Sequence, residues 1–380
     1  MRNYSYLREE RLHYMQDLYT TLNIKRYERM AEQVMSAEKL KFDFGLSKDQ
    51  EERAELLHAD SPVVSFHEHP YVFPVPKEKY LDEYCSLGRL YIGYEGLEAG
   101  GLNAVFAGVH FYCRVAQRRP WSWYDLVYSL GMHHTDTLKQ KDEKFFIGKS
   151  HNDIEYAAKE NKVAIIPTSE CGDVVGNELD NLDVLYGLGL RALGLTYFHQ
   201  NQLGGGELDP EAHLTELGID AIHRMNDLGM MIDLSHTNKF TTLEAIEVSE
   251  KPCVITHSLA AEACGLSNYK SDEEIKALAE KGGVFGVKIH GLLQLKKNSA
   301  VTIEDALDHI EYIVKLVGVD HVAIGPDTEW GEETEYVKGY RNPSQFLNIT
   351  RGLVSRGYSD DEIKKIIGGN VIKVMSEIEK

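Results

Sequence analysis

Eight short apolar runs, spread over most of the chain, constrain its fold more than any other feature of the sequence. Amphipathic stretches separate most of the runs, and near-continuous apolar strands joined by helices are typical of a parallel sheet covered on both faces. Eight such units predict an α/β protein whose sheet closes into a (β/α)8 barrel, the TIM barrel; the alternative is a doubly wound open sheet. The runs are VVSF (63–66), LNAVFAGV (102–109), VAIIP (163–167), ALGLTY (192–197), MMIDLS (230–235), CVITH (253–257), GVFGV (283–287) and HVAIG (321–325).

The N-terminal part of the chain has a different character. It is rich in Glu, Lys, Arg, Leu and Met, and it contains no proline before Pro62. This composition predicts one helix from Tyr6 to Lys39 and another from Lys48 to His58. We therefore expect two parts, an N-terminal helical extension over residues 1–60 and the barrel over residues 61–380.

Charge and cysteine content limit the partners and the compartment. The 380 residues include 60 acidic and 41 basic side chains, a net charge of −19. A strongly acidic surface disfavours nucleic acids and anionic membranes, which are bound by clustered Lys and Arg. The five cysteines form no CxxC pair, and the sequence has neither a signal-peptide pattern nor an apolar run of 18 residues. These features predict a cytoplasmic protein that acts on a small molecule, with a homodimer as the candidate assembly.

Polar side chains stand at the ends of most of the apolar runs. In a (β/α)8 barrel these ends meet at one rim, where such barrels carry their chemistry. These polar side chains are imidazoles and carboxylates, which are donor types that bind zinc, manganese and iron. The set consists of His67, His69, Glu170, His236, His257 and Asp327. The sequence therefore predicts a site for one or two metal ions, with Zn2+ as the first expectation and Mn2+ or Fe2+ as alternatives.

The spacing and the types of these residues predict a hydrolytic chemistry. His67 and His69 alternate with Glu68 along one strand, so the two imidazoles share a face and Glu68 points away from it. A carboxylate can bridge two metal ions. Metal ions lower the pKa of a bound water to about 7, which makes it a nucleophile for amide and ester carbonyls. Asp327, on the last strand, would take the proton of that water and pass it to the leaving group.

The segments around these residues resemble the membrane (renal) dipeptidase family, a branch of the amidohydrolase-like metal hydrolases. The similarity extends from about His58 to Glu379. The matching segments are HADSPVVSFHEHP, ALGLTYFHQN, MMIDLSHTN, CVITHSLAAEAC, VDHVAIGPDTEWG and IIGGNVIKVM. The resemblance implies a barrel enzyme that hydrolyses an amide-type bond with metal-activated water.

The resemblance also implies a role for each site residue, and it adds Tyr197 to the set. It implies that His67 and His69 bind a first metal ion, that His236 and His257 bind a second, and that Glu170 bridges the two. It also implies that Tyr197 contacts the substrate oxygen and that Asp327 transfers the proton.

Three departures from the family pattern set this chain apart. The strand-one motif of the family is His-x-Asp, and here its last position is His69. Ser267 and Asn268 stand where the family usually places an Arg, followed by Asn, that clamps the terminal carboxylate of a dipeptide. Losing that bidentate contact removes about 1.5–3 kcal/mol of charge-assisted bonding. In the strand-eight motif the second acidic residue is displaced to Glu329. After strand seven this chain has Lys288, at a position where the family usually has an apolar or neutral residue. Asn268 and Lys288 become candidate substrate-binding residues.

These observations lead to one expectation and several alternatives. We expect a metal-dependent hydrolase that cleaves an amide-type C–N bond of a small molecule lacking a free α-carboxylate. One alternative is a true dipeptidase in which Lys270 or Lys288 replaces the Arg clamp. Others on the same scaffold are a metal-dependent lyase or decarboxylase and a catalytically inactive binding protein. Finally, the glycines at 204–206 predict a flexible loop above the fourth strand, a candidate lid.

Overall fold

Eight parallel strands form the centre of the molecule. The computed structural model describes residues 29–86, 91–109, 122–140, 143–295, 300–328, 330 and 336–380. The strands lie side by side in the order β13-β12-β11-β10-β9-β8-β6-β2. They are β2 (Val64–Glu68), β6 (Ala104–Gly108), β8 (Val163–Ser169), β9 (Ala192–Gly194), β10 (Met231–Asp233), β11 (Val254–Ser258), β12 (Val284–Val287) and β13 (Val322–Ile324). Each predicted apolar run overlaps one of these strands, so the (β/α)8 barrel is confirmed.

The sheet closes between its first and last strands. Beyond the end of β13, the backbone N–H of Asp327 donates to the carbonyl of His67 in β2 over 3.2 Å. A further parallel strand, β7 (Phe145–Ile147), pairs with the start of β8, and β6 and β9 both pair with its end at Thr168. The end of β8 is thus held on both sides, which fixes the position of Glu170 just beyond it.

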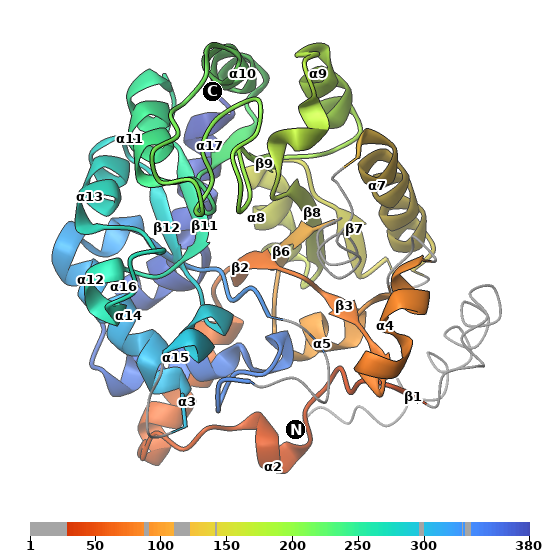
Figure 1. The fold of residues 1–380 in the computed structure, drawn as a ribbon. Coiled ribbons are helices and arrows are strands. Elements are labelled where there is room, and N and C mark those ends of the chain that lie inside the picture. Colours follow the sequence, from red (N-terminus) through yellow and green to blue (C-terminus); the bar gives the residue numbers. More distant parts are fainter. Residues whose placement is uncertain are drawn as a thin grey trace.

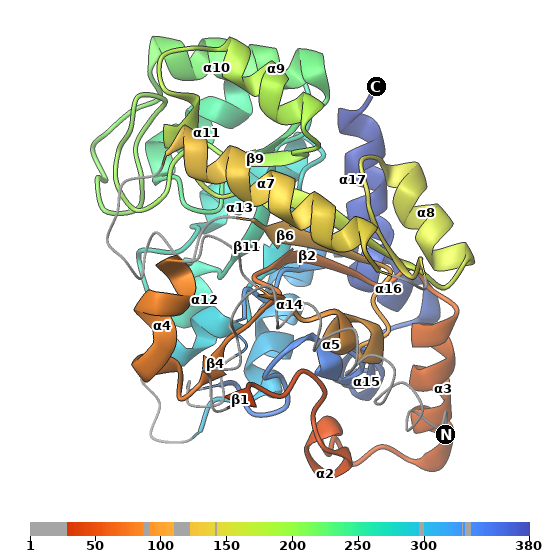
Figure 2. The ribbon, with the colours of Figure 1, turned by 90° about the vertical axis from the view of Figure 1, so that its right-hand side faces the viewer.

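Helices form the outer layer around the strands (Figures 1 and 2). The C-terminal helix α17 lies beside α8, where the backbone N–H of His151 donates to the carboxylate of Glu379 over 3.0 Å (Figure 2). The helices are α2 (Ala37–Leu40), α3 (Lys48–Ala59), α4 (Lys77–Ser86), α5 (Tyr94–Ala99), α7 (Trp123–Leu138), α8 (His151–Lys159), α9 (Asp180–Gly187), α10 (Glu216–Leu228), α11 (Lys239–Val248), α12 (Ala261–Cys264), α13 (Asp272–Glu280), α14 (Ile303–Val317), α15 (Leu347–Ser355), α16 (Asp360–Lys364) and α17 (Asn370–Ile378). Two short antiparallel pairs lie outside the barrel, β1 (Arg29–Met30) with β4 (Pro74–Val75) and β3 (Tyr71–Val72) with β5 (Tyr91–Ile92).

Local sequence signals explain where several helices begin. In α13 the side chain of Ser271 accepts a hydrogen bond from the backbone of Glu274, whose carboxylate accepts one from the backbone of Ser271. This capping box satisfies two backbone donors that the helix itself leaves unpaired. The same helix buries Ile275 and Leu278 on its inner face. Such helices carry their polar face outward and their apolar face onto the sheet, as the alternating pattern of the sequence predicts.

The N-terminal part is only partly helical. Helix α3 confirms the helix expected from residue 48 onward. The long helix expected from Tyr6 to Lys39 lies outside the described residues up to residue 28, and it is wrong between there and α2, which begins at Ala37. In that stretch β1 pairs with β4, and the N–H of Ala31 donates to the carbonyl of Phe73 over 2.9 Å. Pairing with a distant strand outweighs the helical propensity of the local sequence. The boundary at residue 60 stays a prediction.

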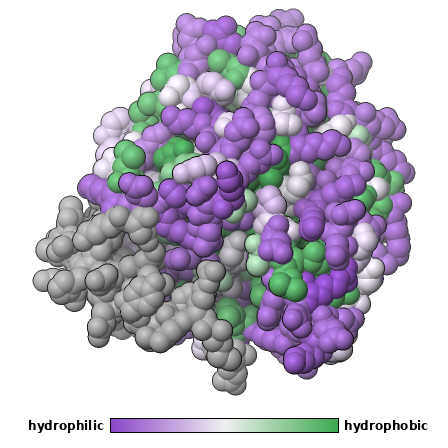
Figure 3. All heavy atoms as spheres, turned by 180° about the vertical axis from the view of Figure 1, so that it is seen from behind, coloured by the Kyte–Doolittle hydropathy of each residue, from purple (hydrophilic) through white to green (hydrophobic). Residues whose placement is uncertain are grey.

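One face of the molecule is mostly hydrophilic where Figure 3 draws it in colour. The face turned away from the viewer in Figure 1 has its hydrophobic residues in small, separate groups among the residues drawn in colour (Figure 3). Within the described ranges, none of the helices combines the length and the apolar character that crossing a bilayer requires.

His58, near the end of α3, is a buried neutral histidine. Its Nε2–H donates to the carbonyl of Gly100 over 2.9 Å, and its Nδ1 accepts from the hydroxyl of Thr350 over 2.8 Å. Burial lowers the pKa of His58 to about 4, and the positive charge of Arg351 adds to that effect. An unfolded histidine takes up its proton near pH 6.5, so acid favours the unfolded chain between about pH 6.5 and 4.

We therefore expect His58 to lower the free energy of unfolding by about 2 kcal/mol between about pH 7.5 and 5. A His58→Gln variant keeps a donor and an acceptor but cannot take up the proton. Its stability should fall less steeply with acid than that of the wild type, as measured by urea unfolding at the two pH values. Equal losses in the two proteins would contradict the assignment.

Candidate metal centre

The six side chains predicted from the strand ends meet at one rim of the barrel. Their positions are His67 within β2, His69 directly after it, Glu170 directly after β8, His236 three residues beyond β10, His257 within β11 and Asp327 three residues beyond β13. All six are buried, and the most exposed of them, Asp327, has only 8% of its surface accessible. Buried groups of this kind are found where they pair with one another or coordinate a metal.

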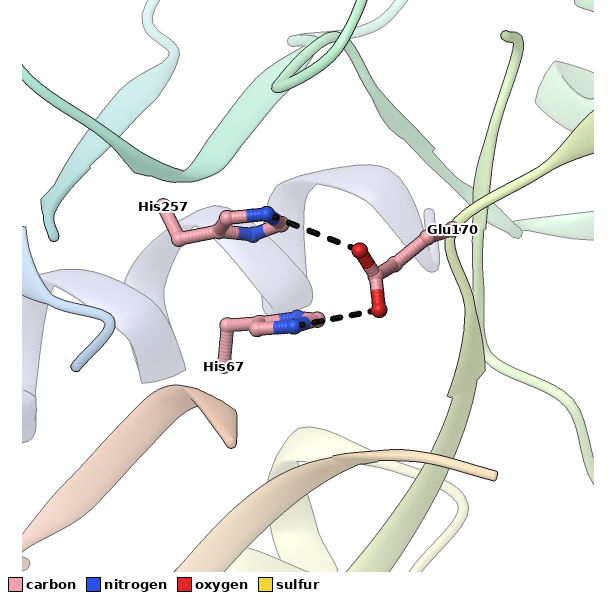
Figure 4. A group of neighbouring side chains, drawn as sticks. All are labelled: His67, Glu170 and His257. Carbon is pink, nitrogen blue, oxygen red and sulfur yellow. Dashed lines mark ion pairs between the residues drawn. The ribbon is translucent and has the colours of Figure 1, made fainter. Parts of the chain in front are cut away.

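Glu170 lies at the centre of the cluster. Its Oε1 is 2.9 Å from Nε2 of His69 and 3.5 Å from Nε2 of His67. Its Oε2 is 3.1 Å from Nε2 of His236 and 3.8 Å from Nε2 of His257. Figure 4 shows the carboxylate facing the stacked rings of His67 and His257. Each carboxylate oxygen thus serves one pair of imidazoles, which is the arrangement expected of a group that bridges two ions.

The imidazole nitrogens that face Glu170 also lie close to one another. The Nε2 atoms of His236 and His257 are 2.9 Å apart, and those of His67 and His69 are 3.4 Å apart. Two groups of residues hold their donor atoms within 4.8 Å of one another, His67 with Glu170 and His257, and His67 with His69 and Asp327. Neighbouring donor groups of this composition suit one or two transition-metal ions.

The electrostatics of the cluster favour a bound cation. Burial lowers the pKa of His69, but the carboxylates of Glu170 and Asp327 outweigh this effect and raise it to about 10. Burial likewise lowers the pKa of His236, and Glu207 and Glu170 raise it to about 9. Burial would raise the pKa values of Glu170 and Asp327. The surrounding imidazoles nevertheless hold the pKa of Glu170 well below its usual range, and Lys288 together with the imidazoles does the same for Asp327. The carboxylates therefore draw positive charge into the site, and the residues present fit a divalent metal.

Glu207 supports the cluster from outside and was not predicted from the sequence. Its Oε1 accepts a hydrogen bond from Nδ1 of His236 over 2.5 Å, and its backbone N–H donates to the carbonyl of His236 over 3.1 Å. On the other side, Nδ1 of His257 lies 2.9 Å from the hydroxyl of Thr256. Groups that bond the second nitrogen of a metal-binding histidine fix the orientation of its ring.

The segment before Glu207 is packed rather than free. Gly204, Gly205 and Gly206 are buried, and the N–H of Gly205 donates to the hydroxyl of Thr241 over 2.9 Å. A Cβ atom added to Gly205 would come within 2.3 Å of the amide nitrogen of Asn238. The expectation of a flexible loop is therefore wrong, because these glycines serve close backbone packing against the next strand–helix connection.

Lys288 and Asp327 form an ion pair beside the cluster. Lys288 directly follows β12, and its Nζ is 2.6 Å from Oδ2 of Asp327. The other oxygen of Asp327 is 3.1 Å from Nε2 of His69. Asp327 thus lies between the candidate metal ligands and a cation, a suitable place for a group that carries a proton. Glu329, the other acidic residue of the strand-eight motif, lies outside the described residues.

The remaining predicted residues lie at different depths. The ring of Tyr197 packs on His236 with a centroid distance of 4.4 Å, so Tyr197 belongs to the site. Asn268 is exposed and lies in the wall of a cavity of about 270 Å³ that Glu207 also lines. Lys270 is buried, and its Nζ donates to the carbonyl of Thr237 over 2.6 Å. Of the two lysines considered for a carboxylate clamp, only Lys288 reaches the cluster.

The side chain of Glu68 points away from the metal donors, as strand alternation predicts. Its Oε1 accepts hydrogen bonds from the backbone N–H and from the hydroxyl of Thr328, both over 2.7 Å. Sequence reasoning had no signal for this contact, since it joins positions 260 residues apart.

The fold and the site together define a class of protein, a metal-dependent hydrolase built on a (β/α)8 barrel. The family follows from comparison with known proteins. The chain belongs to the membrane dipeptidase family, peptidase family M19, whose family model matches residues 51–380. The resemblance drawn from the sequence motifs is thereby confirmed.

Curated relatives of this chain are named as dipeptidases. Dipeptidase tcpJ of Claviceps purpurea is 27% identical over 302 residues, which cover 76% of this chain and 69% of that protein. Dipeptidase aclJ of Aspergillus oryzae is 25% identical over 302 residues, covering 76% and 70% of the two chains.

Solved structures share the fold at lower identity. The probable dipeptidase PvdM from Pseudomonas aeruginosa superposes with a TM-score of 0.71 at 20% identity, covering 88% of this chain and 99% of that one. A metallopeptidase from Rhodobacter sphaeroides, liganded with a phosphinate mimic of the dipeptide L-Ala-D-Ala, gives a TM-score of 0.68 at 18% identity, covering 84% and 99%.

Proposed function

We propose that the chain hydrolyses an amide-type C–N bond of a small molecule that lacks a free α-carboxylate. Membership of a dipeptidase family supports the bond type. The observation that carries the substrate proposal is the make-up of the rim, where Ser267 and Asn268 line the cavity beside Glu207 and neither supplies a positive charge. A neutral pair recovers only part of the bonding that an Arg would give to a carboxylate.

The positive charges near this cavity are already paired with protein groups. Lys239 also lines the cavity, and its Nζ forms an exposed ion pair with Glu273. Lys270 is turned into the protein, where its Nζ also lies 3.5 Å from the carboxylate of Glu274. The arginine side chains that the structure describes bind partners elsewhere. They are Arg53 on Asp360, Arg191 on the carbonyl of Lys149, Arg224 on Asp183, Arg341 over the ring of Tyr336, Arg351 on Glu51 and Arg356 on Glu304.

In the proposed reaction, the four histidines and Glu170 would hold the metal ions, which would supply an activated water and polarise the scissile carbonyl. Zn2+ is our proposal for the ion, because the donor set is rich in imidazole. Asp327 accepts the proton of the water and delivers it to the leaving nitrogen. Lys288 keeps Asp327 ionised before that transfer, since an ammonium 2.6 Å away stabilises the carboxylate. Tyr197, buried against His236, contacts the substrate oxygen.

The substrate proposal predicts a preference between two matched peptides. We expect kcat/KM for the internal bond of L-alanyl-L-alaninamide to exceed that for L-alanyl-L-alanine by about tenfold, because the carboxylates of Glu207, Glu262 and Glu274 also line the cavity and repel an unpaired carboxylate. Steady-state kinetics of the metal-loaded enzyme, with products identified by chromatography, measures the ratio. A tenfold preference for the free acid would require a cationic clamp and would reject the proposal.

A second candidate function is a true dipeptidase in which Lys288 binds the terminal carboxylate. The position of Lys288 at the cluster favours it, because this ammonium group is half-buried beside Asp327. A Lys288→Met variant separates the two readings. In a dipeptidase the change raises KM for the free acid alone, whereas under our proposal it lowers kcat for both peptides by a similar factor.

We also propose a cytoplasmic location. Cys171, Cys253 and Cys264 are free thiols, which supports a reducing compartment. Cell fractionation followed by immunoblotting tests the proposal, and recovery of the protein outside the cytosolic fraction would contradict it.

A further inference from the structure

Asp327 has a backbone conformation that side-chain-bearing residues seldom adopt. Its φ of 53° lies in the left-handed region, where Asp is better tolerated than most residues but still strained. Strain of this kind persists only where the surroundings over-determine the conformation. Contacts with neighbouring residues must therefore hold Asp327 in this conformation beyond the end of the last strand.

Two sets of hydrogen bonds across the closing seam of the barrel provide that hold. The N–H of Asp327 donates to the carbonyl of His67 over 3.2 Å. The next residue, Thr328, donates through both its N–H and its hydroxyl to Oε1 of Glu68, each over 2.7 Å. Glu68 is fully buried and Thr328 is 3% exposed, so water does not compete for these bonds. Two donors on a single acceptor fix both the position and the orientation of the peptide that joins Asp327 to Thr328.

We propose that Glu68 is a positioning residue that acts on Asp327 through Thr328. The first strand thus contributes twice to the site. His67 and His69 belong to the metal donors, and Glu68 between them holds, from the opposite face of the strand, the proton-carrying residue that follows the last strand. The proposal rests on the role of Asp327 given under the proposed function. Glu68 is not itself a metal ligand, because its side chain points to the side of the strand opposite His67 and His69.

Paired variants test the hydrogen bonds one at a time. Glu68→Gln keeps a carbonyl oxygen for Thr328, whereas Glu68→Leu removes the acceptor at similar size. Thr328→Ser keeps both donors, whereas Thr328→Val removes the hydroxyl and leaves the N–H. We expect kcat to fall at least tenfold in Glu68→Leu, less in Thr328→Val, and by less than threefold in the two conservative variants. KM and the metal content per chain should stay within twofold of wild type throughout.

A double-mutant cycle separates positioning from general stability. In an Asp327→Asn background, Glu68→Leu should lower kcat by less than twofold, because the group that it positions is already lost. An equal fold-loss in both backgrounds would overturn the proposal, as would a loss of metal from Glu68→Leu that matches its loss of activity. If Glu68→Leu fails to fold, the cycle is run with Thr328→Val.

A crystal structure of Glu68→Leu keeps the inference distinct from the proposed function. The carboxylate of Asp327 should move away from Lys288 and His69. An unmoved carboxylate would overturn the positioning role whatever the activity. A displaced carboxylate together with full activity of Asp327→Asn would leave the positioning intact and reject Asp327 as the proton carrier.

Discussion

Asp327→Asn is expected to lower kcat by about 10²–10⁴ while the protein keeps its fold and its metal. The amide has nearly the shape of the carboxylate but cannot accept a proton at neutral pH. The other donors, centred on Glu170 and the imidazoles of His69 and His236, remain in place to hold the ion. Turnover of the best substrate and metal content per chain, measured on the same preparation, distinguish a loss of catalysis from a loss of metal.

Asp320→Asn is the matched control. Asp320 lies shortly before β13 and forms an exposed ion pair with Lys365 at 2.7 Å. Exposed pairs of this kind contribute little, so its loss should leave kcat unchanged. Near-full turnover of Asp327→Asn would move the acid–base role to another residue, with Glu329 of the same motif as the next to replace.

Replacing His236 and His257 together with alanine is expected to abolish most metal binding and all measurable activity. The pair supplies two of the four imidazoles, and both face the same oxygen of Glu170. Purified wild-type protein should carry at least one transition-metal ion per chain by atomic emission spectroscopy. The double variant should carry a small fraction of that amount. Chelation should also lower the melting temperature of the wild type but not of the variant, since a metal that binds only the folded chain stabilises it.

His199 and His213 provide the control for that experiment. Both are exposed, and each is paired with a carboxylate, Asp209 and Glu244 respectively. Their double replacement removes the same chemical groups from the surface and should leave metal content and melting temperature as they were. A metal content that does not change in the His236 and His257 variant would remove the basis of the site assignment.

The strand-end residues could be predicted because two simple rules locate them. Apolar runs mark the strands, and a closed parallel barrel brings the ends of all its strands to one rim. His67, His257 and Asp327 are far apart in the chain, yet each follows from its own run and from the topology. No side-chain detail is needed for that step, and so the cluster was predictable while its distances were not.

No comparable rule predicts the contacts that loops make or those across the closing seam of the barrel. Glu207 reaches His236 from a connection whose path depends on glycines packed against Thr241 and Asn238. Three consecutive glycines are equally compatible with a mobile loop, so the sequence alone does not indicate this packing. Likewise, β1 forms because β4 lies beside it, a fact that no local pattern around residues 29–36 contains. In each case a distant partner decides the local structure.

The two roles of Glu207 limit how the specificity of this enzyme can be changed by mutation. Its side chain lines the cavity at the rim and also holds His236. A substitution selected there for a new substrate would disturb the metal centre at the same time. Ser267 and Asn268 line the same cavity, are exposed and belong to a different connection. Directed evolution of the substrate range should therefore accept changes at these two positions and reject them at Glu207.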